Sequence, residues 1–186
     1  MEEKNDKCKF QYNEEEEYCI VEIETSGVSS KKDEMFQIGI MKIKNGKQME
    51  HFISFIKPEK ELSQNIEDIT GITNEMLQEA PSFQEILPQI VDFIKEDMVI
   101  CYCSMFNVDF LKESYKKHQK EFKNPYTDLC RVIKHRYPDL KYYKLTNVAD
   151  YLGIVRSEHF GKGMLERLLL IKHVFNVVVD EMINKI

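Results

Sequence analysis

Two runs of β-forming residues meet at an asparagine–glycine pair, and this feature restricts the fold more than any other. The runs are Met35–Lys44 and Gln48–Ile56, and Asn45-Gly46 stands between them. Asn-Gly favours a two-residue turn whose backbone twist suits a β-hairpin. Residues 18–25, which precede the hairpin and end at Ser26-Gly27, are also predicted to form a strand. The chain is therefore expected to begin with antiparallel strands.

Helical patterns dominate the rest of the chain. A capping box at Ser82 and Glu85 starts an amphipathic helix that is predicted to run to about Lys95. Further helices are predicted at about 63–69, 74–79, 107–118, 128–136, 145–152 and 163–183, with short strands at 99–103 and 124–128. This order predicts a mixed α/β domain in which helices pack against one sheet.

The length of 186 residues and a hydrophobic content of 42% fit a single folded domain. Residues 1–17 contain the acidic run Glu14–Glu17 and are predicted to be a mobile or loosely attached polar tail, with the domain at 18–186. The N-terminus has no signal-peptide pattern, and no apolar run approaches the ~18 residues of a membrane span. We therefore expect a cytoplasmic protein.

The five cysteines are an odd number in a chain without an export signal: Cys8, Cys19, Cys101, Cys103 and Cys130. Cys101 and Cys103 form a C-x-C pair, but the pattern places both in an apolar strand, and no second pair completes a zinc site. We expect reduced, structural thiols.

The charge of the chain is unevenly distributed. The net charge is −6, yet residues 112–144 carry ten Lys or Arg and four Asp or Glu, hence +6, while the other 16 basic and 28 acidic residues give −12. A basic patch on an acidic protein can bind a phosphate backbone, because binding responds to the local potential. The alternative interpretation is a solvated helix face.

Two carboxylates stand on the first predicted strand. Side chains of a strand alternate, so Glu22 and Glu24 share one face while Val21 and Ile23 occupy the other. Neighbouring carboxylates repel unless a cation, a proton or water lies between them. The pair therefore indicates either a metal-binding site or the exposed face of an edge strand.

Several segments in this order resemble a known family. They are Tyr18–Gly27, Ile69-Thr-Gly-Ile-Thr73, Cys103-Ser-Met-Phe-Asn-Val-Asp-Phe-Leu111 and His159-Phe-Gly-Lys-Gly-Met164. Together they resemble the DnaQ-like, proofreading-type (DEDDh) 3′–5′ exonucleases of the ribonuclease H-like superfamily, over about residues 18–183. The resemblance implies that fold, a mixed central sheet with an N-terminal hairpin and packed helices. It also implies four acidic ligands for two divalent ions and one histidine, which together hydrolyse phosphodiesters.

The first two ligand positions of this family hold acids. The family pattern is Asp-x-Glu-Thr-x-Gly, so Glu22 replaces an aspartate by a side chain one methylene longer, and Glu24 matches. His159 matches the histidine that would deprotonate the attacking water. The resemblance therefore implies that Glu22, Glu24 and His159 are the catalytic residues.

The other two ligand positions have lost their charge. Asn107 stands where the third aspartate belongs, and it can offer only a neutral oxygen. Asp109 cannot replace it, because two positions along a helix rotate a side chain by about 200°. Met164 stands at the fourth acid, and a thioether is a poor ligand for a hard ion. Any metal site is reduced to Glu22, Glu24 and Asn107.

Two carboxylates in place of four are not expected to hold a stable pair of dications, so magnesium or manganese is expected only if residual activity exists. Our leading interpretation is a degenerate exonuclease, retained for binding the ends of single-stranded DNA or RNA. The resemblance implies that Thr25, Gly27 and Phe106 would contact such an end. The basic segment would follow the phosphates, and aromatic side chains would stack on bases.

Two other functions stay open. One is a scaffold that binds a protein partner in replication or repair. The other is a working exonuclease with a remodelled site, using one metal on Glu22 and Glu24 with His159 as the base. If no metal binds, we expect a proton or a basic side chain to neutralise the glutamates, and Lys162 is the first candidate for that role.

Overall fold

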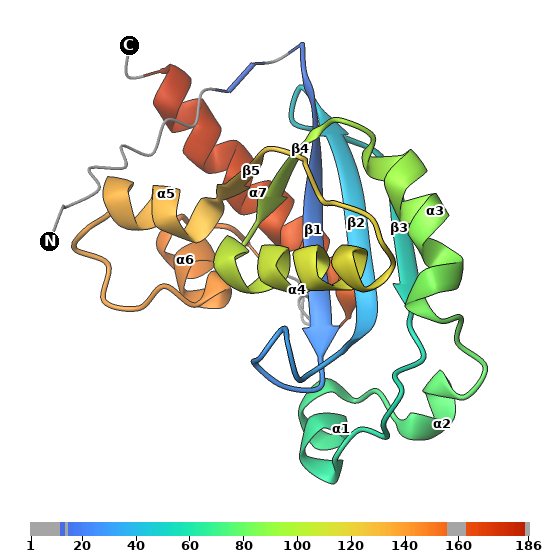
Figure 1. The fold of residues 1–186 in the computed structure, drawn as a ribbon. Coiled ribbons are helices and arrows are strands. Elements are labelled where there is room, and N and C mark those ends of the chain that lie inside the picture. The colour runs from blue at the N-terminus through green and yellow to red at the C-terminus, as the bar shows by residue number, and fades with distance from the viewer. Residues whose placement is uncertain (1–11, 14, 156–162, 185–186) are drawn as a thin grey trace, which may run out of the picture.

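The computed structural model describes residues 12–13, 15–155 and 163–184. Its centre is one five-stranded sheet in the order β3-β2-β1-β4-β5 (Figure 1). The strands are β1 (Glu17–Thr25), β2 (Met35–Lys44), β3 (Lys47–Phe55), β4 (Met98–Cys101) and β5 (Tyr126–Asp128). Neighbours within β3-β2-β1 are antiparallel, while β4 runs parallel to both β1 and β5. The predicted mixed sheet is confirmed.

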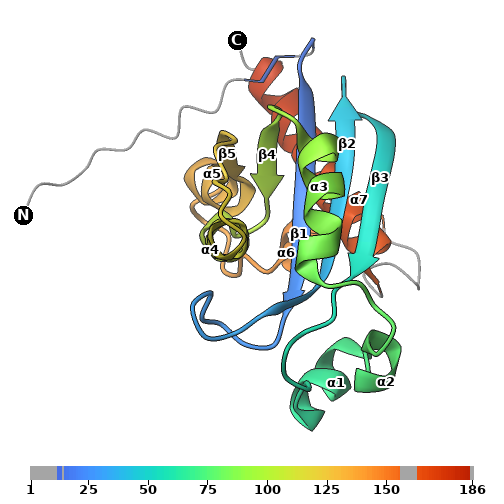
Figure 2. The ribbon, with the colours of Figure 1, turned by 45° about the vertical axis from the view of Figure 1, so that its right-hand side comes forward.

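Seven helices are described, and the longer ones cover both faces of the sheet (Figure 2). They are α1 (Gln64–Thr70), α2 (Asn74–Leu77), α3 (Phe83–Ile94), α4 (Ser104–Lys117), α5 (Leu129–Arg136), α6 (Leu145–Tyr151) and α7 (Met164–Ile183). One core cluster joins β1 and β2 to α5, α6 and α7. A second cluster joins the opposite face of the same strands to α3 and α4. The sheet is thus the middle layer of three.

The alternation of β1 is what separates the two cores. Tyr18 and Ile20 point toward the α7 side, while Val21 and Ile23 point toward α3 and α4. Glu22 and Glu24 follow Tyr18 and Ile20 in this alternation and therefore face α7.

The hairpin turn explains the register of β2 and β3. Asn45 and Gly46 both adopt positive φ, at 48° and 67°, which a type I′ turn requires. The Asn176 side chain of α7 donates a hydrogen bond to the Gly46 carbonyl at 2.8 Å, so the turn is also tied to the helix layer. The predicted hairpin is confirmed.

The segment after β4 differs from the expectation. The strand ends at Cys101, and Cys103 already precedes α4 with φ of 62° and an exposed side chain. The prediction that Cys103 belongs to an apolar strand was therefore wrong, and α4 begins three residues before the predicted Asn107. The apolar run Val99–Cys103 gave no indication of the turn, because a non-glycine residue with a left-handed backbone conformation leaves no sequence signal.

Part of the predicted tail contacts the domain. The Tyr12 ring stacks on Tyr18 with centroids 5.5 Å apart, and the Asn13 amide donates to the Tyr18 hydroxyl at 2.7 Å. The tail boundary at residue 17 stays a prediction, since residues 1–11 and 14 are not described. Within the described residues, the structure contains no helix of the length and apolarity needed to span a membrane.

Candidate functional site

The acidic pair lies at the end of the central strand. β1 is flanked by β2 and β4, so the alternative that the two glutamates occupy an exposed edge strand was wrong. Glu22 is only 6% exposed. The pairing of β1 with β2 is irregular between Glu24 and Thr25, as in a β-bulge. Bulges change the direction of side chains and are common beside active sites. This irregularity lies at the C-terminal end of β1, next to Glu24.

An arginine from α7 bridges both carboxylates. The Arg167 guanidinium donates one hydrogen bond to Glu24 Oε1 and another to Glu22 Oε1 and so forms an ion pair with each. The side chains of Arg167 and Glu24 are 34% and 21% exposed, so the pair is largely removed from water. A planar guanidinium with several donors can hold two acceptors at once, which a lysine ammonium does with less geometric definition.

Asn107 adds hydrogen bonds to Glu22 and its strand from α4. Its side-chain amide donates to Glu22 Oε2 at 3.0 Å and to the Val21 carbonyl at 3.2 Å. Asn107 is buried on α4, while Asp109 two positions later is exposed, as helical rotation predicts. The amide group therefore acts here as a donor to the carboxylate.

Met164 fills the space over a glycine beside the pair. Gly39 of β2 is the register partner of Glu22. A Cβ atom built on Gly39 would lie 2.3 Å from Met164 Cγ and 2.6 Å from its Sδ. The thioether side chain is buried. The position where the family resemblance implies a fourth acid is thus occupied by apolar packing against the sheet.

Burial and Arg167 shift the pKa values of Glu22 and Glu24 in opposite directions. Burial raises the pKa of Glu22, while Arg167 and Asn107 oppose this effect, and the pKa stays above its ordinary value. The pKa of Glu24 is also raised by burial and opposed by Arg167. Burial alone would lower the pKa of Arg167, but the two carboxylates raise it. The guanidinium is therefore a permanent cation in this site.

This donor set does not fit a pair of hard divalent ions. Three of the four carboxylate oxygens already accept hydrogen bonds from Arg167 or Asn107. The remaining family position offers a thioether, which hard ions bind poorly. Among the described residues, no cluster of three or more His, Cys, Asp or Glu is arranged to hold a metal. What the arrangement does hold is one organic cation between two anions.

The turn after β1 is closed by its own side chains. The Thr25 hydroxyl donates to the Gly27 carbonyl at 2.7 Å, and the Ser29 amide donates to Asp33 Oδ2 at 2.8 Å. A Cβ on Gly27 would lie 2.4 Å from the Asp33 carboxylate, so a larger residue would require the Asp33 side chain to move. Thr25 and Gly27 thus shape the loop beside the acids. Contact with a nucleic acid at these two residues stays a prediction.

A groove opens next to the ion pair, with a volume of about 620 Å³. Its lining comes from the ends of β1, β2 and β3, from the α1 region and from the start of α7: Glu24, Gln37, Phe55, residues 68–72, Gly163, Met164 and Arg167. Phe106 does not line it. This side chain packs against Phe110, with ring centroids 5.0 Å apart, and faces a separate cavity near α5.

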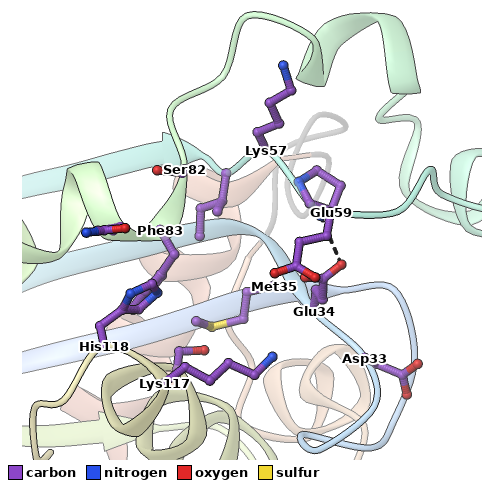
Figure 3. Close-up of a pocket in the computed structure, with 13 residues that line it drawn as sticks. Asp33, Glu34, Met35, Lys57, Glu59, Ser82, Phe83, Lys117 and His118 are labelled. Carbon is purple, nitrogen blue, oxygen red and sulfur yellow. Dashed lines mark hydrogen bonds between the residues drawn. The ribbon is translucent and has the colours of Figure 1, made fainter.

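A further cavity of about 420 Å³ lies on the opposite face of the sheet, between the 33–35 loop and the facing ends of α3 and α4 (Figure 3). Phe83 and His118 stack at 5.6 Å along one side, and the Glu59 amide donates to Glu34 at 3.1 Å. Its lining carries charges of both signs and includes none of the residues of the acidic pair.

Two expected residues fall outside the described part of the chain, namely His159 and Lys162. The expected basic partner of the glutamates exists, but it is Arg167. A sequence signal for it was present: Met164, Arg167, Leu168 and Ile171 have the spacing of one helix face. An arginine within an otherwise apolar stripe indicates a buried acidic partner.

A mixed sheet that carries two acids at the end of its central strand, covered by helices on both faces, defines the ribonuclease H-like exonuclease fold. The solved structures of this kind include Escherichia coli exonuclease I in a zinc-bound complex with single-stranded DNA, with a TM-score of 0.79 at 14% identity over 90% of this chain and 41% of that chain. The nuclease domain of 3′hExo, a DEDDh family member bound to rAMP, matches with a TM-score of 0.74 at 16% identity, over 90% and 93% of the two chains.

The chain belongs to the exonuclease family (RNase_T), whose family model matches residues 20–161. Its curated relatives include the PolC-type DNA polymerase III of Clostridium perfringens, 34% identical over 145 residues, and that of Bacillus subtilis, 30% identical over 148 residues. Both alignments cover 78% of this chain and 10% of the polymerase. The predicted DnaQ-like family and fold are thereby confirmed. The chain spans only a small part of these relatives.

Proposed function

We propose that this protein is an exonuclease-fold domain that binds the ends of single-stranded nucleic acid without hydrolysing them. The observation that carries the proposal is the Arg167 bridge between Glu22 and Glu24. Two-metal hydrolysis needs ions that clamp both the attacking and the leaving oxygen. One guanidinium offsets part of the charge of the two acids but supplies neither a bound hydroxide nor such a clamp.

Retained binding of nucleic acid is supported by the groove and by solved structures of the same fold. The groove of about 620 Å³ runs beside the acids, and Arg167 lines it with a partly exposed guanidinium. The related exonuclease I structures include complexes with single-stranded DNA and with a dT13 oligonucleotide. Arginine suits a phosphate group because its donors form a planar fork.

The basic segment adds a surface for the strand. Lysine ammonium groups lie over tyrosine rings at three places: Lys112 over Tyr126 at 4.7 Å, Lys134 over Tyr143 at 5.5 Å and Lys141 over Tyr142 at 5.2 Å. The rings of Tyr126 and Tyr142 are exposed. Exposed aromatic rings next to cations are typical of surfaces that stack bases and neutralise phosphates.

The first test is for hydrolysis. Purified protein is incubated with a 3′-labelled single-stranded oligonucleotide and magnesium or manganese. We expect a rate at least ~10³-fold below that of a four-acid relative, since even one stabilising contact is worth roughly 10²–10³. A His159→Ala variant is the control for contaminating nuclease. Digestion that this variant abolishes would show that the protein is a remodelled, working exonuclease and would refute the proposal.

The second test is for binding, measured by fluorescence anisotropy in EDTA. Affinity should fall steeply between ~50 and ~200 mM salt, because phosphate contacts release counterions. Lys141→Glu should weaken oligonucleotide binding. Lys47→Glu should leave binding unchanged, because Lys47 follows the hairpin turn at the end of β1 opposite to the acidic pair. No binding at ~50 mM salt would eliminate nucleic-acid binding as the function.

A protein partner is the second candidate, favoured by the match to a segment of PolC-type DNA polymerases. If the chain acts as a scaffold in replication or repair, a polymerase or nuclease should co-purify with it after nuclease treatment. Oligonucleotide binding should then be weak and insensitive to Lys141→Glu. These two results together separate this candidate from the leading one.

A further inference from the structure

Two cysteines, one just before α4 and one within α5, line the same small cavity. Cys103 is exposed and directly precedes α4, and Cys130 is the buried second residue of α5. The cavity has a volume of about 350 Å³ and is lined by Cys103, Met105, Phe106, Asp128, Cys130, Arg131 and Lys134. Although Cys101 and Cys103 are neighbours in sequence, the turn after β4 leaves Cys101 buried and brings Cys103 to Cys130.

The two thiols interact electrostatically across this cavity. Cys103 has the largest effect on Cys130 and, together with Lys134, lowers the pKa of the Cys130 thiol to about 7, against the raising effect of burial. The same interaction raises the pKa of Cys103. When protonated, the Cys130 thiol donates a hydrogen bond to the Tyr143 carbonyl at 3.9 Å. Cys19 and Cys101 differ, since burial raises the pKa of both. A thiolate is the reactive form of cysteine, so Cys130, although buried, differs from Cys19 and Cys101.

We propose that Cys103 and Cys130 form a redox-active dithiol, which hydroperoxides convert into a reversible disulfide that joins α4 to α5. The position of Cys103 supports this, because its φ of 62° is a conformation that a non-glycine residue adopts at a cost, and such outliers concentrate at functional positions. The proposal concerns a cavity apart from the acidic pair and does not depend on nucleic-acid binding.

The chemistry balances with the peroxide as the oxidant. The Cys130 thiolate attacks the nearer peroxide oxygen, the O–O bond breaks, and sulfur becomes a sulfenic acid while hydroxide leaves and takes up a proton. The Cys103 sulfur then attacks the sulfenic sulfur, the S–S bond forms, and the S–O bond breaks with loss of water. Two thiols and one hydrogen peroxide thus give one disulfide and two waters, and an organic hydroperoxide would release an alcohol in place of one water. A small-molecule thiol reverses the reaction by exchange.

The disulfide closes the chain between residues 103 and 130 and fixes the first turn of α4 to α5. Closing a loop of this size restricts the unfolded chain, so the oxidised protein should unfold at a higher temperature than the reduced protein. The added stability should vanish on reduction.

The test treats the full chain with one equivalent of hydrogen peroxide and measures the intact mass. We expect the loss of two hydrogen atoms, reversed by dithiothreitol. Tandem mass spectrometry, which separates Cys103 from Cys101, should link Cys103 to Cys130. Cys8 lies outside the described residues, so Cys8→Ser is the control and should oxidise in the same way. A bond to Cys8, Cys19 or Cys101, or an unchanged mass, would overturn the proposal.

Single variants give a second measurement that does not depend on disulfide geometry. In Cys103→Ser, the sulfenic acid on Cys130 should persist and be trapped by dimedone. In Cys130→Ser, oxidation at pH 7 should slow by about tenfold, because an ordinary thiol is only a few per cent ionised there. The wild-type rate should rise with pH through the region near 7. Equal rates in Cys130→Ser and wild type would refute the assignment of Cys130 as the reacting thiol.

Discussion

Removing the arginine from the acidic pair should destabilise the protein in a pH-dependent way. In Arg167→Met, Glu22 and Glu24 lose their ion pairs, and Asn107 is the partner that remains for Glu22. Breaking a buried ion pair by removing one partner costs about 3–5 kcal/mol. Since the Arg167 side chain is 34% exposed, we discount this to ~2–4 kcal/mol at pH 8. For a domain of this size the loss corresponds to roughly 4–16 °C in Tm.

The sign of the pH dependence follows from the two acids. Burial already raises the pKa of Glu22 and Glu24, and loss of Arg167 leaves that effect less opposed. An acid whose folded pKa lies above its unfolded value stabilises the fold fully below the unfolded value. This stabilisation is lost as the pH rises through the folded pKa. The cost of Arg167→Met should therefore be small near pH 5 and largest near pH 8.

The assay is urea unfolding at both pH values, with a matched arginine as the control. Arg136 also binds a glutamate, Glu181, with two hydrogen bonds to one carboxylate oxygen and one to the main-chain carbonyl; the Arg136 side chain is 21% exposed and the Glu181 side chain 36%. Arg136→Met should cost less than Arg167→Met at pH 8, because it leaves one carboxylate without its arginine rather than two, and that carboxylate is more exposed than Glu22. Adding Glu22→Gln and Glu24→Gln to Arg167→Met should recover most of the loss at pH 8. A cost equal to that of Arg136→Met, or one that grows toward acid pH, would refute the reasoning.

Two further predictions concern the same site. One variant combines four changes: Glu22→Asp, Asn107→Asp, Met164→Asp and Arg167→Ala. Manganese should raise its thermal stability, because a ligand that binds the folded state stabilises that state. The variant with the first three changes and Arg167 kept should be stabilised little by manganese. Absence of metal binding in the folded four-change variant would mean that the position of Asn107 or Met164 in the site is wrongly assigned. Gly39→Ala should cost ~1–3 kcal/mol in urea unfolding, because its Cβ would lie 2.3 Å from Met164 Cγ. Truncating Met164 in that background should reduce the cost of Gly39→Ala, and an unchanged cost would contradict the proposed clash.

Local patterns predicted much of this fold. The Asn45-Gly46 turn needs two positive φ angles, and this chemical requirement is visible in the sequence. Helical rotation likewise places Asn107 and Asp109 on different sides of α4, and the first is buried while the second is exposed. The alternation of β1 placed both glutamates on one face. Each of these inferences uses a period or a turn that the chain encodes within a few residues.

The errors arise where a long-range contact decides the outcome. Whether β1 is central or at an edge depends on β4, which follows far along the chain and contributes only three paired residues to β1. The cation first considered for the glutamates was Lys162, because of its closeness in sequence to Met164, and this residue lies outside the described part of the chain. The cation that the structure shows is Arg167, which lies one helical turn after Met164 and which α7 brings to the strand. Proximity in sequence was a weaker guide than the face of the helix.

The residues at positions 107, 164 and 167 are compatible with the two glutamates only in combination. Arg167 carries one positive charge and satisfies two glutamates, so a third carboxylate at position 107 or 164 would lack a partner in a buried site. Asn107 can donate to Glu22, which an ionised aspartate cannot do. Met164 lies one turn before Arg167 and closes the space against the sheet with apolar atoms. Reverting Asn107 or Met164 alone to an acid should therefore destabilise the site, because a third carboxylate would add negative charge beside a single guanidinium.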